Sequence, residues 1–553
     1  MSIQLNLFTG EKPNTDVANL PVGYASKAVN LNLHHNTLKS VRDDLLIKEL
    51  SHNHDYCEIQ QGIIIEHKKA IFTCALRHYQ DLMFNTGMFD YPAVSDLKLD
   101  GKIKWGRLGV PAPKSPPNVF AIQPLHTKTT LDINVSNNLR EKLDPRCYAF
   151  TYVNWLGHEG AMSPPSKIVN VEDGESVTLH NFKFPKHYYR IKSIKVYRTT
   201  ATSITTNDIS SKAVWLYCGE IKTDWKAHFV DNLKMIELGK PYLAEHNDMP
   251  PDNLVQLCCV NDTTLVGFYN NYYLRKSEPY NPSAFPLKYE IKSPHPILRI
   301  MPLDNDVIVF TTQGNYKLND ITSASEQHAL VPYRERWKLV NHDIIGSCIH
   351  TDIGILWVSQ DGLVLTTGGS QLMLTGNFFS MYDWQKLKPD TMRLGYHHGI
   401  VYITSNVCTY MMGIGSSGLV NSKNETYLTK LDISPDYYLT STSEAAYYVK
   451  DRKIYQIQGS PNAKPYTWLS KLFVFKSTIN FAVMQYNISQ EQGHIEVFLL
   501  DDSFKLLYNV VLSKSGLCNI RLKGGISYSK LYVLVHGNKE LYSLTLSTSY
   551  REL

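Results

Sequence analysis

The chain has 553 residues, 43% of them hydrophobic and 19% charged, and a formal net charge of +5. This length exceeds what one hydrophobic core serves, so we expect roughly three or four domains of an ordinary folded protein. This net charge is small, and the basic residues are spread along the chain without a run of Lys or Arg. Such a charge is compatible with contact to DNA or an acidic partner but is no evidence for it. The lack of a long apolar run excludes a membrane-spanning helix.

The nine cysteines lie mostly inside apolar, strand-like segments, and none forms a CxxC pair. Buried free thiols explain this pattern better than a disulfide framework, because disulfides persist in oxidising compartments. The N-terminal sequence lacks the basic and apolar regions of a secretory signal. We therefore expect a protein that is made in a cytosol and stays soluble there.

Residues 1–60 are expected to form an N-terminal arm. In it, Val29, Leu31 and Leu33 alternate with polar residues before a turn at His35 and Asn36, a pattern that predicts a small hairpin or extended arm.

Residues 61–125 are expected to hold a first propeller blade and a connector. Apolar runs at residues 63–65, 70–76 and 82–84 predict three short strands. The prolines of residues 111–117 then exclude a helix or a central strand.

The pattern changes in residues 126–237. From Cys147 onward, about seven short strands with proline-rich corners are expected within roughly 85 residues, which is typical of a fibronectin type III sandwich. This sandwich would be inserted between the first blade and the remaining blades.

One pattern of apolar run, turn and apolar run then recurs five times within residues 238–475. After a polar linker, the copies start at Leu254, Ile297, Ile345, Met392 and Tyr437. A meander that recurs every 40–50 residues or so has the period of a propeller blade. With the first blade, the repeats predict a β-propeller of about six blades. A single short helix is expected here, at residues 380–387.

Residues 476–553 contain six short segments of strict apolar and polar alternation, separated by tight turns. They predict a second, C-terminal β-sandwich. The expected fold class is therefore all-β: a propeller whose first blade is separated in sequence, an inserted fibronectin-III-like sandwich and a C-terminal sandwich.

No motif predicts a catalytic, cofactor-binding or metal-binding residue, and we expect that the protein is not an enzyme. The His158-Glu159 pair lacks the second histidine of HExxH, because Met162 stands there. Residues 359–362 do not match the sialidase Asp box and are typical of a hairpin turn. A carboxylate pair that meets only in the folded chain leaves no such motif in the sequence.

Several other clusters are expected to be solvated loops and turns: His34 and His35, residues 52–55, residues 304–306, His397 and His398, and residues 413–418. Basic residues alternate with aromatic ones at residues 198–200 and 333–340, which is typical of a solvated strand face. Base-specific readout of nucleic acid has no support. Non-specific passage of duplex DNA past a weakly charged wall is compatible with the composition.

Several phrases, taken in order, resemble one protein family. They are TGEKP at residues 9–13, LPVGYASKAVN at 20–30, YVN at 152–154, GHEG at 157–160, SPPS at 163–166, VYRT at 196–199, PPDNL at 250–254, SEPYNP at 277–282 and LSTSYREL at 546–553. This order resembles the tail nozzle and related virion structural proteins of tailed bacteriophages, especially short-tailed ones. The resemblance covers nearly the whole chain.

The resemblance implies a propeller-bearing subunit that forms a homo-oligomeric ring, usually a hexamer, in the virion tail after assembly in the host cytoplasm. Such a ring continues the DNA channel from adaptor and portal-side proteins, retains the genome and allows its ejection on host contact. Tail fibres and a host surface receptor are further implied partners, and neither a cofactor nor membrane insertion is implied. The chain is shorter than many nozzles, so a nozzle and another ring of the tail tube both fit.

Two alternative functions remain open. The first is a receptor- or glycan-binding tail protein, which surface aromatic residues clustered on one rim would favour. The second is a propeller glycan hydrolase, which a buried carboxylate pair at the centre of the ring would favour.

Overall fold

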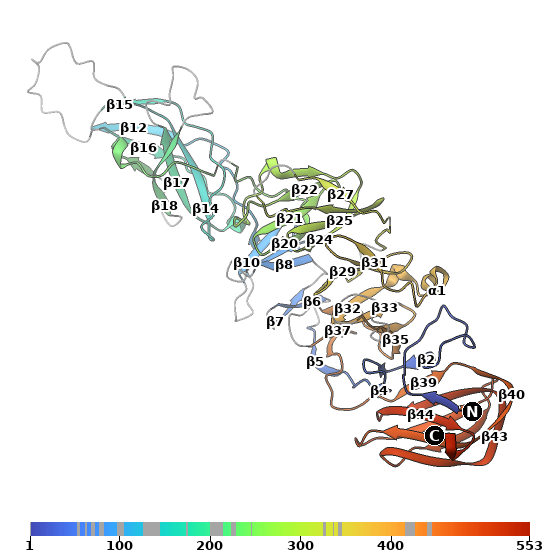
Figure 1. Cartoon of the computed structure of the whole chain (residues 1–553). Helices are drawn as coiled ribbons and strands as arrows, with labels where there is room; N and C mark the ends of the chain where they lie inside the picture. Colours follow the sequence, from blue (N-terminus) through green and yellow to red (C-terminus); the bar gives the residue numbers. More distant parts are fainter. Residues whose placement is uncertain are drawn as a thin grey trace, which may run out of the picture. The chain divides into compact units, whose positions relative to one another are not determined.

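The computed structural model is nearly all β, as predicted, with a single α-helix, α1 (Met381–Lys386), in the part of the chain that it describes (Figure 1). The described residues are 2–51, 56–60, 63–67, 72–76, 82–96, 104–124, 144–172, 175–199, 214–222, 228–244, 246–323, 328–335, 337–340, 346–414, 426–439 and 445–552. Two compact units are present. One comprises Met1–Ala70, Phe310–Asn315 and Pro332–Leu553, and the other comprises Ile71–Val309 and Tyr316–Val331.

Antiparallel groups of four strands are the recurring element. Four of the five sequence repeats contribute to separate four-stranded sheets, and the repeat from Met392 contributes four strands to a sheet of 12. The first three sheets are β8 (Phe72–Leu76), β9 (Leu82–Thr86), β10 (Ala93–Asp96) and β11 (Gly106–Arg107); β20 (Val255–Val260), β21 (Thr264–Tyr269), β22 (Tyr273–Lys276) and β23 (Glu290–Lys292); and β24 (Ile297–Leu303), β25 (Asp306–Thr311), β26 (Gly314–Leu318) and β27 (Leu330–Pro332). The border between the two units falls within the third sheet.

The other three repeats lie in the unit that contains both chain ends. Their strands are β28 (Cys348–Thr351), β29 (Gly354–Val358), β30 (Leu363–Thr366) and β31 (Gln371–Met373); β32 (Arg393–His397), β33 (Ile400–Thr404), β34 (Thr409–Gly413) and β35 (Tyr427–Leu431); and β36 (Tyr437–Leu439), β37 (Tyr447–Lys450) and β38 (Lys453–Gln456). The expected helix is α1, which begins after Ser380 because the Ser380 side chain accepts a hydrogen bond from the Asp383 amide. Short 3-10 turns occur at η5 (Leu287–Tyr289), η6 (Pro389–Thr391) and η7 (Tyr550–Glu552).

The first four-stranded sheet differs from the sequence prediction, which grouped residues 63–65 with the two strands that follow. In the structure β7 (Ile63–His67) pairs instead with β6 (Tyr56–Gln60), and β10 and β11 complete the sheet of β8 and β9. Only two residues separate β6 from β7, and a two-residue connection favours a hairpin between adjacent strands.

The inserted segment folds as two sheets around a shared core of aromatic and β-branched residues. One sheet consists of β12 (Asn118–Pro124), β16 (Glu175–His180) and β19 (Phe229–Asp231), and the other of β14 (Tyr148–Asn154), β17 (Ile191–Thr199) and β18 (Trp215–Lys222). The pair β13 (Asp144–Arg146) and β15 (Val169–Val171) and the turns η2 (His187–Tyr189) and η4 (Met235–Glu237) complete the segment. Because β12 pairs with β16, this fold begins earlier than the expected boundary at residue 126.

The C-terminal segment contains fewer and longer strands than predicted. They are β40 (Phe473–Ile488), β41 (Ile495–Leu500), β42 (Leu506–Val511), β43 (Gly516–Gly537) and β44 (Leu541–Ser547). Two of the six segments expected from the sequence, residues 518–525 and 530–537, lie in the single strand β43, which continues through Gly524 and Gly525. Opposite them, the register against β40 shifts between Phe481 and Val483, so the glycines mark an irregularity in one strand and not its end.

The N-terminal arm is not an independent element, because its strands complete sheets of the C-terminal half. β1 (Ser2–Leu5) pairs with β44, and β2 (Ala25–Val29) lies between β39 (Tyr466–Ser470) and β35. β5 (Leu45–Glu49) forms the fourth strand beside β38. The expected hairpin is present as β3 (Leu31–Asn32) and β4 (Lys39–Ser40). As a result one sheet of 12 strands runs from β1 to β32, and the two chain ends lie close together (Figure 1).

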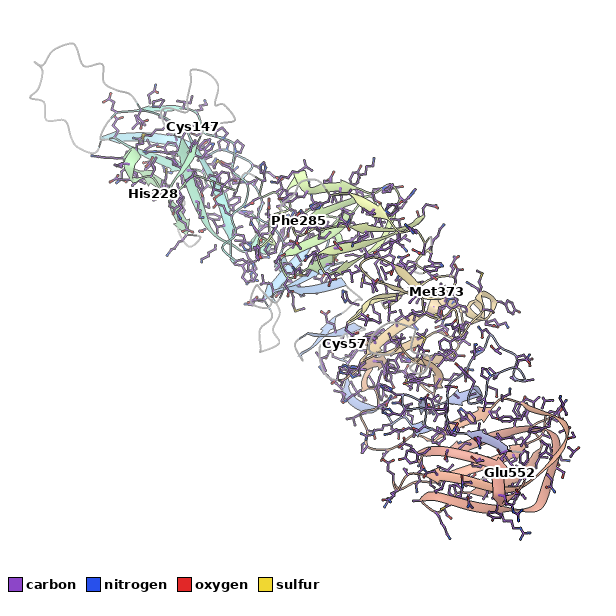
Figure 2. All side chains as sticks on the ribbon, viewed as in Figure 1. Cys57, Cys147, His228, Phe285, Met373 and Glu552 are labelled. Carbon is purple, nitrogen blue, oxygen red and sulfur yellow. The ribbon has the colours of Figure 1, made fainter. Side chains whose placement is uncertain are left out.

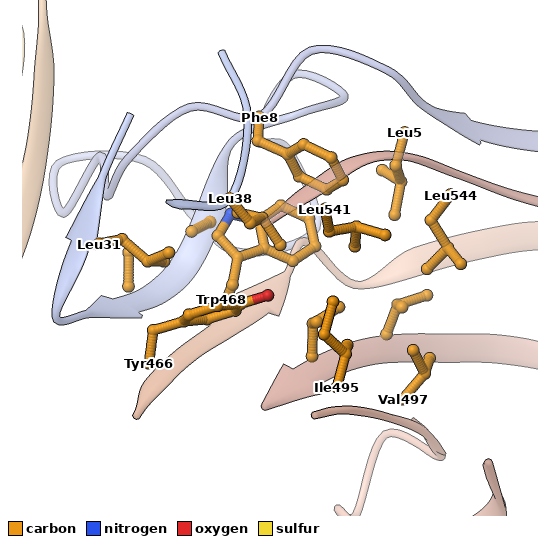
Figure 3. Packing of buried hydrophobic residues seen from close by; sticks show 14 of the residues in the cluster. Leu5, Phe8, Leu31, Leu38, Tyr466, Trp468, Ile495, Val497, Leu541 and Leu544 are labelled. Atoms are coloured by element: carbon orange, nitrogen blue, oxygen red, sulfur yellow. The ribbon is translucent and has the colours of Figure 1, made fainter. Parts of the chain in front are cut away.

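Trp468 lies at the centre of the core that joins the arm to the C-terminal strands (Figure 3). Its ring meets that of Phe8 edge-on, with centroids 5.1 Å apart, and both side chains are fully buried. The Trp468 indole N–H also donates a hydrogen bond to the Thr9 carbonyl oxygen at 3.2 Å. The arm is therefore held by apolar packing as well as by strand pairing.

Candidate functional site

The His158-Glu159 pair forms structural contacts and not a metal site. The Glu159 carboxylate accepts hydrogen bonds from Thr151 Oγ1 and Tyr197 OH, both at 2.6 Å, and pairs with Lys195 Nζ at 2.9 Å. His158 Nδ1 lies 2.9 Å from Ser283 Oγ, and burial lowers the pKa of His158. These contacts fix the turn that follows β14.

Residues 359–362 form the expected turn. Ser359 Oγ donates a hydrogen bond to the Gly362 carbonyl oxygen at 2.8 Å and accepts one from the Asp361 amide at 3.2 Å. The indole N–H of Trp384 in α1 donates to the Ser359 carbonyl oxygen at 3.0 Å. The Ser359 side chain therefore closes the turn, as in other serine turns, and the Trp384 hydrogen bond joins the turn to α1.

Of the remaining clusters, His34, His35, Asp304 and His398 lie in turns, as predicted. The prediction is wrong for Asp306, His397 and Gly413, which lie in β25, β32 and β34. His34, His35 and His398 are exposed, and His398 and Asp304 have left-handed backbone conformations typical of tight turns. Residues 52–55 and 415–418 lie outside the described residues. Among the residues that are described, no group of three or more His, Cys, Asp or Glu side chains could hold a metal ion. None of the described helices could span a membrane.

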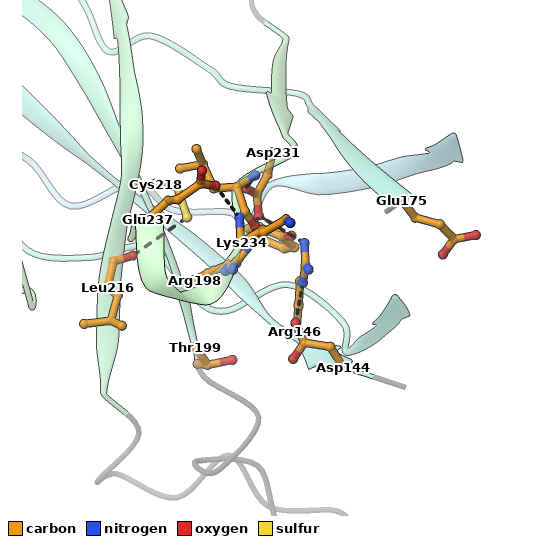
Figure 4. A network of polar contacts seen from close by, with 12 residues as sticks. Asp144, Arg146, Glu175, Arg198, Thr199, Leu216, Cys218, Asp231, Lys234 and Glu237 are labelled. Atoms are coloured by element: carbon orange, nitrogen blue, oxygen red, sulfur yellow. Dashed lines mark hydrogen bonds and ion pairs between the residues drawn. The ribbon is translucent and has the colours of Figure 1, made fainter. Parts of the chain in front are cut away.

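The prediction that residues 198–200 form a solvated face is wrong for Arg198, which is only 1% exposed. Its guanidinium lies 2.7 Å from the Asp231 carboxylate, which also accepts a hydrogen bond from Tyr148 OH at 2.8 Å (Figure 4). The sequence signal was present, because Arg198 falls on the same face of β17 as the buried Ile194 and Val196.

This charged network links four strands of the inserted sandwich. Asp231 ends β19, Arg198 and Tyr148 come from β17 and β14, and Arg146 of β13 approaches Asp231 at 3.7 Å. Burial, reinforced by the Asp231 carboxylate, raises the pKa of Tyr148. Arg198 Nη1 also donates a hydrogen bond to the Leu233 carbonyl oxygen at 2.9 Å, so the buried ion pair joins β17 to β19 and to the residues that follow β19, and the network serves the fold.

Two strand edges are candidates for contact with other molecules. β5 is the last strand of its sheet, and its consecutive residues Leu45, Leu46 and Ile47 are 43%, 46% and 42% exposed. β42 pairs only with β41, and its Leu506 and Val511 are about half exposed. Because neighbouring side chains of a strand point to opposite faces, β5 is open on both faces. Open apolar edges are templates for pairing with another strand.

The described cysteines are free thiols, and most are buried; Figure 2 labels Cys57 and Cys147 as examples. Burial raises the pKa of Cys258, and it raises that of Cys259 to about 12. Since the thiolate is the reactive species, we expect a maleimide to modify both residues at least ~10-fold more slowly in native than in denatured protein. Mass spectrometry of the labelled peptides measures this ratio, and rapid labelling of the native chain would contradict it.

Fold and polar clusters together define an all-β protein of several sheets, in which the clusters around Glu159 and Asp231 form structural contacts. No family model matches the chain, and no curated protein matches it. Among solved structures it is similar to BamB of Moraxella catarrhalis, with 13% identity and a TM-score of 0.23 over 54% of this chain and 88% of that one. It is also similar to AztD of Citrobacter koseri, with 10% identity and a TM-score of 0.23 over 69% and 99%. A third is an exo-beta-1,3-galactanase of Phanerochaete chrysosporium, with 9% identity and a TM-score of 0.19 over 53% and 95%.

Proposed function

We propose that this chain is a structural subunit of a bacteriophage tail that assembles with copies of itself into a nozzle or tail-tube ring around DNA. The short sequence segments that resemble tail nozzle proteins, taken in order, support this assignment. The structural observation that carries the proposal is the open apolar edge of β5. A protein that acts alone protects such an edge with charges, prolines or a covering segment. In β5 the charged residues Lys48 and Glu49 lie at one end and pair with Glu66 and Lys453, so the apolar part of the edge is residues 45–47. In this proposal another subunit covers that part.

The blades of a β-propeller are, in this proposal, the five four-stranded sheets and the antiparallel strands β32–β35, which are part of the sheet of 12 strands. Four-stranded antiparallel sheets of this size are the usual blade. The sheet of β8–β11 is the first blade, and the inserted sandwich separates it in sequence from the blade of β20–β23. β5, from the N-terminal arm, supplies the fourth strand of the blade formed by β36–β38.

The mechanism we propose is mechanical and electrostatic. A wall of hydrogen-bonded sheets resists the pressure of packaged DNA, and the sheet of 12 strands extends this rigidity from a blade to the C-terminal strands. Without a dense run of Lys or Arg, the wall holds phosphates weakly, so duplex DNA passes without sequence preference. Adaptor or portal-side proteins and tail fibres are the expected neighbours, and contact with the host starts ejection.

Electron microscopy of the purified protein or of virions that contain it tests the assembly. The expected result is a ring with an open bore of roughly 20 Å or more, wide enough for duplex DNA. Separate monomers at high concentration, or trimers without a channel, would contradict the proposal.

The β5 edge gives a sharper test. The double substitution Leu46→Lys and Ile47→Lys is expected to shift the ring to monomers, because two charges would have to be buried in each contact. Size-exclusion chromatography with light scattering measures the mass, and circular dichroism checks the fold. Val407→Lys is the matched control, since Val407 is 53% exposed but lies in a turn outside the strand edges. An intact ring in the double variant would exclude β5 from the contact.

One observation favours the alternative, a receptor- or glycan-binding tail protein. Phe89 stacks on Tyr91, and Tyr91 stacks on Tyr188, with centroids 5.3 Å apart in each pair, and all three rings are partly exposed. Arg107 of β11 lies over the Tyr91 ring at 5.1 Å and also pairs with Asp252. The same rings therefore also have a structural role, because they join the inserted sandwich to the β8–β11 sheet. Loss of host-cell binding in a Tyr188→Ala protein that still forms rings would support the alternative.

A further inference from the structure

The open β5 edge accounts for only one side of the proposed ring contact. In a closed ring of more than two copies, one surface of each subunit meets a different surface of its neighbour. Contact between β5 and the β5 of another copy would instead give a two-fold dimer. A ring built through β5 therefore needs a second surface on the same chain, which receives this strand.

β42 presents a second open apolar edge, in the same compact unit as β5. Among the described residues it pairs only with β41, and its sequence LLYNVV contains no charge and no proline. Leu506 is 51% and Val511 53% exposed. The edge strand β31 of the same unit differs, because it has only three residues and shortness protects an edge. β42 lacks such protection.

The backbone of β42 can accept a further strand. The Leu512 amide donates a hydrogen bond to the Ile495 carbonyl oxygen of β41 at 2.8 Å. From Tyr508 to Val511 the register against β41 is regular. Successive residues of a strand direct their N–H and C=O groups alternately to its two sides. The N–H and C=O groups of Asn509 and Val511 therefore point away from β41.

Charged side chains beside the two edges have opposite signs. Asp43 lies just before β5, and Lys505 and Lys514 lie on either side of β42, where both are exposed. Within the described ranges no ion pair neutralises these three side chains, whereas the charged residues of β5 itself pair within their own chain. An antiparallel contact of the apolar residues brings Asp43 near Lys514, and a parallel contact brings it near Lys505. The charges therefore favour contact between these two edges.

We propose that β42 receives the β5 edge of a second copy of this chain, so that each subunit of the ring contributes β5 to one neighbour and β42 to the other. This inference rests on the proposed function and assigns the second half of the same contact. Residues 45–47 of one copy lie against the exposed Leu506 and Val511 of the next, which removes both apolar edges from water. Each strand has one register shift against its own partner, so the strand pairing across the contact is short and apolar packing completes it.

Two variants that each lack one edge test this contact under conditions in which the wild type forms the ring. One is the β5 variant with Leu46→Lys and Ile47→Lys, and the other carries Leu506→Lys and Val511→Lys in β42. Each is expected to be a monomer by itself, because one half of every contact is lost. In an equimolar mixture, one intact β42 edge and one intact β5 edge remain, so a complex of twice the mass of the chain and no larger is expected. Size-exclusion chromatography with light scattering measures these masses.

Controls separate loss of the edge from loss of the fold. The β42 substitutions lie at positions that are about half exposed, so the variant is expected to fold, and circular dichroism checks this. Asn509→Pro is a second β42 variant, which removes an N–H group that points away from β41 and is expected to weaken the ring as well. Val407→Lys is expected to form the ring as the wild type does.

Failure of this inference differs from failure of the proposed function. Rings that either folded β42 variant forms as readily as the wild type would overturn the inference and leave the proposed function intact, since a different surface then receives β5. A mixture of the two double variants that stays monomeric would overturn it too. If the wild type itself forms no ring, the proposed function fails, and this inference fails with it.

Discussion

Trp468→Ala is expected to lower the free energy of unfolding of the unit that contains both chain ends by about 3–5 kcal/mol. The side chain is fully buried in the largest core cluster, and its loss leaves a cavity between Phe8 and the strands of the C-terminal sheet. The hydrogen bond from the indole to the Thr9 carbonyl oxygen is lost as well. Urea-induced unfolding of the full chain, followed by circular dichroism, measures the change.

Phe8→Ala tests whether packing of the N-terminal arm contributes to the stability of this unit. Removal of this ring from the arm is expected to destabilise the same transition by about 3 kcal/mol, because Phe8 is also fully buried. Tyr382→Ala is the control, since Tyr382 is 71% exposed on α1 and its loss is expected to change stability by less than about 0.5 kcal/mol. A change at Phe8 as small as that at Tyr382 would show that the arm is not held by this packing.

Asp231→Ala is expected to destabilise the inserted sandwich by about 3–5 kcal/mol, because it leaves Arg198 as a buried and unpaired charge. Tyr148 also loses the acceptor of its hydroxyl proton. The effect is expected to be local, so hydrogen exchange in β17 and β18 measures it better than global unfolding.

Asp144→Ala is the matched control for the charged network. Asp144 accepts a hydrogen bond from Arg146 Nε at 2.8 Å, but its side chain is 34% exposed, so its loss is expected to cost about 1 kcal/mol or less. Unchanged exchange of β17 and β18 in Asp231→Ala would mean that Arg198 finds another partner or water, and the structural role of the network would be refuted.

Local patterns made much of the fold predictable. The spacing of apolar runs from Leu254 onward identified the repeated meanders, because strand periodicity and tight turns are properties of neighbouring residues. The capping residue Ser380 and the following proline identified α1 for the same reason. Strand partners far apart in sequence were not predictable. Nothing in residues 45–49 shows that β5 pairs with β38, since that pairing depends on which sheet edge is open in the folded chain.

In the candidate sites, too, local contacts were predictable from the sequence and contacts between distant residues were not. The turn at residues 359–362 was predicted correctly, because its hydrogen bonds are local. Arg198 was misjudged because an arginine was taken as a surface residue, although its position beside Ile194 and Val196 indicated the core. Its carboxylate partner Asp231 lies 33 residues away, and the pair forms only when β17 and β19 come together. The contact between Lys276 Nζ and His328 Nε2 carries no sequence signal, because it joins residues that are 52 positions apart.

The completion of C-terminal sheets by the N-terminal arm has a consequence for synthesis. β1 and β2 leave the ribosome long before their partners β44 and β39, which lie in the last quarter of the sequence. At roughly 5–20 residues per second, the arm waits on the order of a minute without its partners. Long-range pairing of this kind slows folding and leaves strand edges open to wrong contacts. It also means that the unit closes only after β44 has been made, so a product that terminates before β44 cannot fold correctly.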